Sequence, residues 1–272
     1  MSTSHQIRQT RLNRKKLLPN LPPCQTALRY GWPDSDSHGM RKHHLEATHL
    51  PFSPRTLSVP ARQQRLVYAA LNQLNTWVCR LMYGVKALEE SPVPSEGPAL
   101  IVCDHNSMGD PLVLLATAGQ PIRFMMAQEI YDQPHAKWVF QAFRCIPIRR
   151  GKRDVKAVRA MLEGLSANEV MGLFPEGGLD RHRSDEGHPG IGYLAIKSGA
   201  PVVPASIVWK GPHSVTSMVQ TIFVPSKATI RYGKPLQFPQ ESRPSKDSMQ
   251  SCTKEIMARI EELRKSLLSG VS

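Results

Sequence analysis

The chain has 272 residues, of which 40% are hydrophobic and 21% charged, and its mean hydropathy is −0.32. This length allows one large or two small domains, with enough apolar residues for a hydrophobic core. The net charge of +13 favours an anionic partner, such as nucleic acid, anionic lipid or a phosphorylated substrate. No stretch approaches the ~20 apolar residues of a membrane-spanning helix, which disfavours an α-helical membrane protein.

The positive charge is concentrated near the N-terminus. Residues 1–65 hold 11 Lys and Arg against three Asp and Glu, a net charge of +8 that leaves +5 for the rest of the chain. Residues 1–60 are rich in Pro, Ser, His and Arg without a sustained apolar period, so we predict a disordered basic arm there. The arm lacks the apolar region of a secretory signal, but the absence of acidic residues before Asp34 leaves an organelle transit peptide open.

The five cysteines are widely spaced and include no CxxC pair. This spacing fits neither a zinc site nor a disulfide framework and favours a reducing compartment. We therefore expect a cytoplasmic protein with no metal site. Cys103 lies in an apolar run, which predicts a buried and unreactive thiol.

Residues 61–90 predict an amphipathic helix, with its regular pattern over 62–88. Apolar side chains recur there at steps of three and four: Leu66, Ala70, Leu74, Trp77, Leu81, Val85 and Leu88. Asn72, Asn75 and Arg80 fall on the opposite side. The helix either packs its apolar side on the core or lies in a membrane interface, with Trp77 and Tyr83 at headgroup depth. The periodicity does not decide between these interpretations.

After a turn at 91–94, short apolar runs alternate with helical patterns through residues 98–240. The predicted strands are 99–103, 122–127, 145–148, 170–174, 202–209, 220–224 and 228–232. The predicted helices are 111–118, 130–143, 154–165, 191–197 and, within a C-terminal segment 245–270, 247–268. This alternation predicts one α/β domain over 61–272, with a mostly parallel or mixed central sheet flanked by helices on both faces.

His105 and Asp110 lie between the first predicted strand and the next helix. Reactive groups of open α/β sheets gather at such strand ends. A carboxylate at Asp110 would hold the imidazole in one tautomer and stabilise its cation, which leaves the other ring nitrogen to accept a proton from a hydroxyl. The alternative is a polar loop in which Asp110 is the N-cap of the helix and His105 has no chemical role.

Two further strand ends carry polar residues. Phe174, Pro175, Glu176 and Gly177 form a turn in which Glu176 would bind an acceptor hydroxyl or hold nearby basic groups; the alternative is an ordinary surface turn. Residues 149–153 contain four cations around a glycine, which fits a phosphate group. Taken alone, this basic segment fits a solvated run of charge better.

Together, these segments resemble the four ordered sequence blocks of the glycerolipid acyltransferases. The blocks are HxxxxD at 105–110, IPIRRG ending at 151, FPEG at 174–177 and VPASI at 203–207. The resemblance covers roughly residues 99–236 and is greatest to the 1-acylglycerol-3-phosphate acyltransferases. It implies a glycerol-3-phosphate acyltransferase-like fold, with residues 98–240 as the catalytic core.

The resemblance also implies roles for these residues. His105 would deprotonate an acceptor hydroxyl, with Asp110 orienting it, and the hydroxyl would attack the thioester of acyl-CoA or an acyl carrier protein without a covalent acyl-enzyme. The fourth block is associated with the acyl side. No metal or redox cofactor is implied. The expected acceptor-binding residues are Arg149, Arg150, Phe174, Pro175, Glu176, Gly177 and Arg181.

The expected reaction is acylation of a lysophospholipid, 1-acylglycerol 3-phosphate, to give phosphatidic acid. The expected setting is a cytoplasmic enzyme held peripherally on an anionic membrane surface by the basic arm and the helix at 61–90, without nucleic acid. The chain departs from the family at Asp104, where Asn is frequent, and at Gly178 and Leu179, where Thr and Arg are common. These departures leave open glycerol 3-phosphate or a lyso-aminolipid as acceptor, or a lipid-binding pseudoenzyme.

Overall fold

The computed structural model describes residues 61–150, 154–176, 187–188, 190–211 and 224–270. The predicted basic arm, the cations Lys152 and Arg153, and the candidate site residues Gly177 and Arg181 lie outside these ranges. Most of the predicted strand 220–224 also lies outside them, and Val224 itself is not in a strand.

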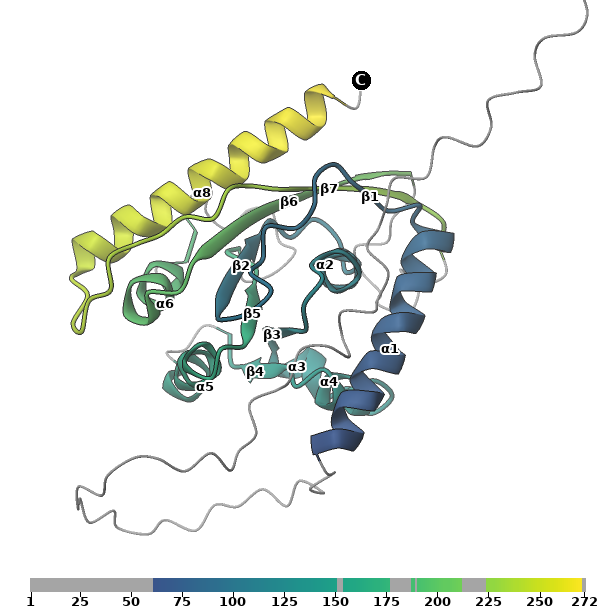
Figure 1. Ribbon diagram of the computed structural model, residues 1–272, viewed down its shortest axis with the longest axis horizontal. Helices are drawn as coiled ribbons and strands as arrows, with labels where there is room; N and C mark the ends of the chain where they lie inside the picture. Colours follow the sequence, from purple (N-terminus) through teal and green to yellow (C-terminus); the bar gives the residue numbers. More distant parts are fainter. Residues whose placement is uncertain (1–60, 151–153, 177–186, 189, 212–223, 271–272) are drawn as a thin grey trace, which may run out of the picture.

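A seven-stranded sheet forms the centre of the part of the chain that the structure describes (Figure 1). Its strands are β1 (Lys86–Ala87), β2 (Ala99–Cys103), β3 (Ile122–Ala127), β4 (Ile146–Ile148), β5 (Val170–Leu173), β6 (Val202–Lys210) and β7 (Lys227–Tyr232). Their order across the sheet is β1-β7-β6-β2-β5-β3-β4. Only β6 and β7 pair antiparallel, so the mixed, mostly parallel α/β sheet predicted from the sequence is confirmed.

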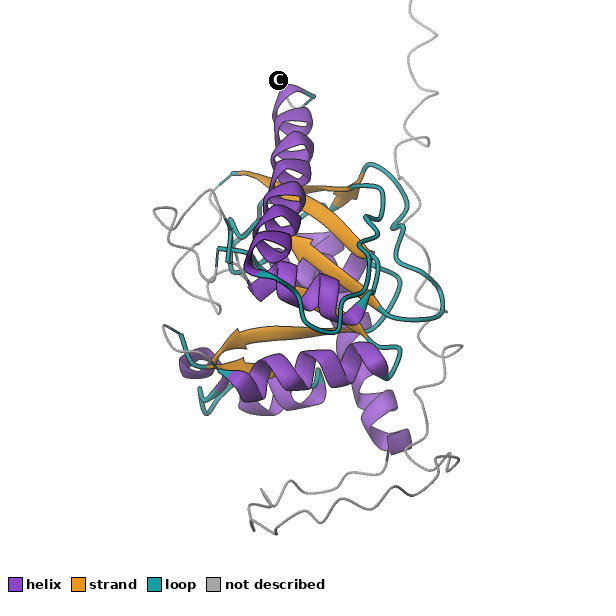
Figure 2. Ribbon diagram, turned by 90° about the vertical axis from the view of Figure 1, so that its left-hand side faces the viewer, coloured by secondary structure: helices purple, strands orange, loops and turns teal. Residues whose placement is uncertain are grey.

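Helices cover both faces of the sheet. One face carries α1 (Ala61–Met82), α2 (Asp110–Thr117) and α4 (Lys137–Ala142), and the other carries α5 (Val155–Ser166), α6 (Gly190–Ser198) and α8 (Lys246–Ser269). Figure 2 shows α8 crossing in front of the strands. Ile101 of β2 packs in the cluster under α1 and α2, whereas Leu100 and Val102 pack under α5, α6 and α8. Burial on both faces explains why β2 is an uninterrupted apolar run.

Two predicted helices differ in extent from those observed. The first ends at Met82 rather than at 88, because Gly84 adopts a positive φ of 45° and Lys86–Ala87 pairs with β7. The predicted helix 130–143 is divided into α3 (Gln128–Tyr131) and α4, with Pro134 in the intervening turn. Proline lacks an N–H donor and disfavours helical geometry in the residue before it, so the helix cannot run through this position.

α1 packs on the core with Tyr68 and Cys79, but most of the predicted apolar stripe lies on its exposed side. Asn72, Asn75 and Thr76 are buried, whereas an exposed apolar face contains Leu66, Val67, Leu74, Trp77 and Leu81. The exposed fractions of Leu74, Trp77 and Leu81 are 61%, 52% and 75%. The helix therefore packs on the core, as one of the two interpretations expected, but with a side other than the predicted apolar stripe. Within the described ranges, no helix has the length and hydropathy needed to cross a bilayer.

Candidate active site

The predicted site residues that the structure describes lie at one edge of the sheet. Strands β2, β5, β3 and β4 run parallel, so their carboxyl ends meet at the same edge. His105 follows β2 and Phe174 follows the neighbouring β5, and their rings stack with centroids 4.2 Å apart and planes 20° apart. Phe124 of β3 stacks in turn on Phe174, at 5.9 Å and 7°. The side chain of Phe174 therefore forms one wall against the imidazole.

His105 and Asp110 form a hydrogen-bonded pair, with 3.0 Å between His105 Nδ1 and Asp110 Oδ2. The carboxylate is fully buried, whereas 13% of the His105 side chain is exposed. Because a carboxylate only accepts hydrogen bonds, Nδ1 carries the hydrogen and Nε2 is the free acceptor of the neutral ring. This tautomer is the one that a general base needs.

The Asp110 carboxylate accepts hydrogen bonds from three further donors. The backbone amides of Asn106 and Ser107 both reach Oδ2 at 2.7 Å, and the indole Nε1 of Trp209 reaches Oδ1 at 2.7 Å. The N-cap of α2 is Gly109, so the alternative in which Asp110 acts as the N-cap is wrong. Trp209 was not among the predicted site residues, since no spacing links it to a loop 99 positions earlier in the chain.

Asp104 bonds the loop after β2 to the neighbouring strand β6. Its carboxylate accepts hydrogen bonds from Ser206 Oγ at 3.0 Å, from the Ile207 amide at 3.1 Å and from Asn106 Nδ2 at 2.8 Å. Burial raises the pKa of Asp104, and these hydrogen bonds oppose the shift. The charge that departs from the family pattern is thus bound to β6 rather than to the ring of His105.

Glu176 lies beside the same loop. Its Oε2 accepts a hydrogen bond from the backbone amide of His105 at 3.3 Å. Burial, followed by the charge of Asp104, raises the pKa of Glu176. Cys103 is fully buried, which confirms the predicted burial of its thiol, and this burial raises the thiol pKa well above the ordinary value.

The predicted basic residues lie farther along the edge. Arg149 and Arg150 are exposed after β4, three strands from β2, which corresponds to roughly 14 Å across a sheet. Arg150 Nη1 lies 3.3 Å from Glu129 Oε1, and the Arg149 amide donates to Asp154 Oδ2 at 3.2 Å. Among the described residues, the structure gives no hydrogen bond or ion pair that joins either arginine to the His105–Asp110 pair.

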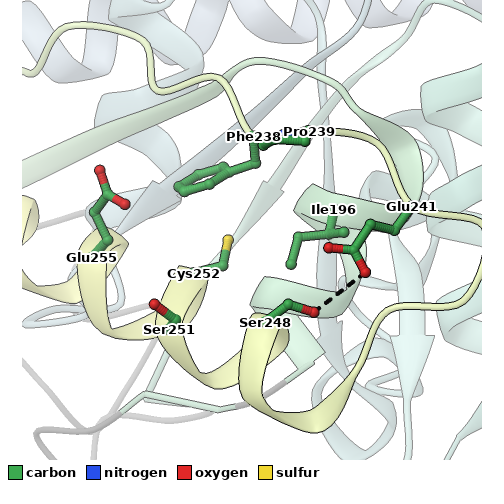
Figure 3. A pocket seen from close by; sticks show the side chains of 8 residues that line it. All are labelled: Ile196, Phe238, Pro239, Glu241, Ser248, Ser251, Cys252 and Glu255. Carbon is green, nitrogen blue, oxygen red and sulfur yellow. Dashed lines mark hydrogen bonds between the residues drawn. The ribbon is translucent and has the colours of Figure 1, made fainter.

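A cavity of about 190 Å³ lies between α6, α8 and the segment at 238–241 (Figure 3). It is lined by Ile196, Phe238, Pro239, Glu241, Ser248, Ser251, Cys252 and Glu255. None of these is a predicted site residue. In the described ranges, no three His, Cys, Asp or Glu side chains are grouped so as to hold a metal ion.

Residues 84–208 match a family model described as acyltransferase, and this range contains the His105–Asp110 pair, Phe174 and Glu176. This part of the chain is thus similar to the acyltransferase family, and it contains all four of the sequence blocks that predicted the resemblance. The fold of the chain is similar to the crystal structure of the 1-acyl-sn-glycerophosphate (LPA) acyltransferase PlsC from Thermotoga maritima. That similarity has a TM-score of 0.53 and 20% identity, and it covers 76% of this chain and 85% of that one. No curated protein matches the sequence.

Proposed function

We propose that this protein transfers a fatty acyl group from acyl-CoA or an acyl carrier protein to the hydroxyl of 1-acylglycerol 3-phosphate, which gives phosphatidic acid. The observation that carries the proposal is the 3.0 Å contact between His105 and Asp110 at the end of β2, in the part of the chain that is similar to the acyltransferase family. The similar Thermotoga protein, named for lysophosphatidic acid, supports this choice of acceptor.

His105 is the general base of the proposed reaction. Nε2 accepts the hydroxyl proton as the acceptor oxygen attacks the thioester carbonyl, and Asp110 stabilises the resulting imidazolium. The tetrahedral intermediate then collapses, the carbon–sulfur bond breaks, and the leaving thiolate takes the proton back from Nε2. General-base assistance of this kind contributes roughly 10²–10⁴ in rate. The burial of Cys103 favours this direct route over an acyl-thiol intermediate on that residue.

The acceptor would lie along the carboxyl edge of the sheet. Phe174 would confine its glycerol near His105, while Arg149 and Arg150 would bind its phosphate bidentately. Because Arg150 is paired with Glu129, the incoming phosphate would replace that carboxylate. Gly177 and Arg181 stay predicted acceptor contacts from the sequence.

A membrane surface is the proposed source of the acceptor. The exposed apolar face of α1 is of the kind that enters the headgroup region, and the net charge of +8 in residues 1–65 would add attraction to anionic lipid. An apolar helix face together with a basic segment gives stable peripheral attachment, whereas either feature alone binds a membrane only weakly.

The proposal is tested with labelled acyl-CoA and a panel of acceptors: lysophosphatidate, glycerol 3-phosphate, other lysophospholipids and a lyso-aminolipid. Wild type should acylate lysophosphatidate fastest, and His105→Ala should lower the rate by a factor of about 10² or more with an unchanged circular dichroism spectrum. His135→Ala, at an exposed histidine, is the matched control. Full activity of the His105 variant would refute the role of its imidazole, and fatty acid release without an acceptor would indicate hydrolysis instead.

A further inference from the structure

We infer that Trp209 is a positioning residue for this reaction, and that Tyr83, which follows α1, holds the Trp209 indole in place. The inference rests on the proposed role of His105 as the base. Both aromatic residues lie just outside the range 84–208 that the family model covers, one at each end. The contacts that connect them to His105 are therefore a property of this chain that the family match does not describe.

The Trp209 indole fixes the rotation of the Asp110 carboxylate. Its Nε1–H donates to Oδ1 at 2.7 Å, while His105 and two backbone amides bind the other oxygen, Oδ2. The terminal torsion of an aspartate has broad minima, so donors on one oxygen alone leave the carboxylate free to tilt. A donor on each oxygen keeps Oδ2 in line with His105 Nδ1.

Tyr83 supports the indole from the other side. The two rings meet edge to face, with centroids 5.1 Å apart and an interplanar angle of 80°. Tyr83 is fully buried, which rules out its predicted place at headgroup depth beside Trp77. Its carbonyl accepts a hydrogen bond from the Ala228 amide at 2.9 Å, so its backbone is fixed to β7.

A second contact ties α1 to α2, the helix that begins with Asp110. Asn75 Nδ2 donates to the Leu112 carbonyl at 2.9 Å, two residues beyond Asp110 in α2. Asp110 is thus held through its backbone by α1 and through its side chain by Trp209, which Tyr83 supports. The helix with the exposed apolar face is part of the structure that orients the base.

Loss of the indole N–H has two expected effects. The carboxylate loses its alignment, so kcat falls by about tenfold while the KM values for both substrates stay within about twofold. The carboxylate charge is also less neutralised and holds a proton on the imidazole more strongly, so the acid limb of the pH–rate profile moves to higher pH. A residue that only filled space would not move that limb.

A substitution of Trp209 leaves the ionisable residues near His105 and Asp110 in the sequence. They are Cys103 at the end of β2, Asp104 after it, Glu176 after β5, Tyr83 after α1, Tyr232 on β7 and Arg264 on α8. A movement of the acid limb is therefore assigned to the lost N–H.

The test compares full-length Trp209→Phe with wild type, and uses Trp138→Phe, at an exposed tryptophan of α4, as the matched control. Lower kcat with a shifted acid limb in the first variant alone supports the inference. If wild type and Trp209→Phe have the same kcat and the same pH–rate profile while His105→Ala is inactive, the inference is overturned and the proposed function stands. An active His105→Ala overturns both.

A second measurement needs no folded variant at position 209. The NMR resonance of the Trp209 indole N–H should differ between wild type and Asp110→Asn, because its charged acceptor becomes neutral in the variant. The Trp138 indole resonance should be the same in both. An unmoved Trp209 resonance would contradict the hydrogen bond on which the inference depends.

Discussion

Two carboxyl groups, the buried Asp104 and the half-buried Glu176, flank the backbone of His105 in addition to its partner Asp110. Burial raises the pKa of both Asp104 and Glu176, whereas the Asp110 carboxylate accepts four hydrogen bonds. The loop after β2 thus places beside the imidazole a buried carboxylate whose charge is stabilised by hydrogen bonds, and beside the backbone two carboxyl groups whose pKa is raised. Asp104 thereby replaces the frequent Asn of the family without placing a free charge on the base.

The raised pKa of Asp104 gives a pH-dependent stability. The folded protein holds this proton to higher pH than the unfolded chain does, so the free energy of unfolding falls as pH rises from about 4 through the raised pKa. Asp104→Asn should remove that fall, so the unfolding free energies of variant and wild type diverge as the pH rises toward neutrality.

Urea denaturation at a series of pH values measures this divergence. Loss of the Asn106 hydrogen bond in the variant adds a constant offset, so the slope with pH is the quantity to compare. Asp132→Asn is the control, because Asp132 is on the surface and its hydrogen bonds from Lys137 and Gln128 lower its pKa. Parallel profiles for wild type and Asp104→Asn would contradict the prediction.

The six-residue loop between β2 and α2 allowed the pairing of His105 with Asp110 but did not exclude the N-cap alternative, and the other sequence blocks favoured the pair. The contacts of Trp209 and Ser206 could not be predicted, because they come from a strand about 100 residues away. A strand pattern identifies β6 but does not say that it lies beside β2, nor which of its side chains reaches a given carboxylate.

At the scale of elements, α1 combines a buried side of mixed polar and apolar residues with an apolar exposed side. Its inner contacts to α2 are specific, since Asn75 satisfies the Leu112 carbonyl and Cys79 packs in the core cluster below. Periodicity located the helix but could not tell which side faces inward, because it assumes that apolar residues are buried. That assumption fails where a protein meets another apolar phase.

Substitution of Leu74 and Leu81 by Asp should abolish most binding to lipid vesicles. Both side chains are exposed, so the free energy of unfolding should change by less than about 0.5 kcal/mol each, and activity on a short-chain, soluble acceptor should persist. Vesicle co-sedimentation and thermal unfolding measure the two effects. Leu268→Asp, at an exposed leucine of α8, is the matched control, and equal vesicle binding by all variants would remove α1 from the docking surface.

At the scale of the whole molecule, the fold class followed from the alternation of strands and helices, which also gave helices on both faces. The strand order did not follow, because short parallel strands carry no signal of their neighbours. Nor could the sequence show that β7 returns antiparallel to β6 and brings β1 to the edge. Those pairings fix where Tyr83 enters the core.

The charge distribution predicts how the molecule meets a membrane. Residues 1–60 carry a net charge of +6, and each cation near an anionic surface contributes about 1 kcal/mol. Removal of these residues should weaken binding to vesicles rich in anionic lipid at least tenfold in low salt. The difference should shrink in 1 M salt, where charges are screened within about 3 Å.

Titration of the full chain and of residues 61–272 against anionic and zwitterionic vesicles measures this effect. Zwitterionic vesicles should bind the two chains equally. Binding to anionic vesicles that neither the deletion nor salt alters would show that the N-terminal charge has no part in attachment.

The family range 84–208 begins one residue after Tyr83 and stops one residue before Trp209. A chain trimmed to those limits would lack α1, the side chains of Tyr83 and Trp209, and the strand β7 that pairs with β6. The apolar sheet face that α1 covers would be exposed to water, so such a fragment should aggregate and lack activity. For this protein, the smallest fragment worth expressing must include the residues that position Asp110, and it therefore extends beyond residues 84–208.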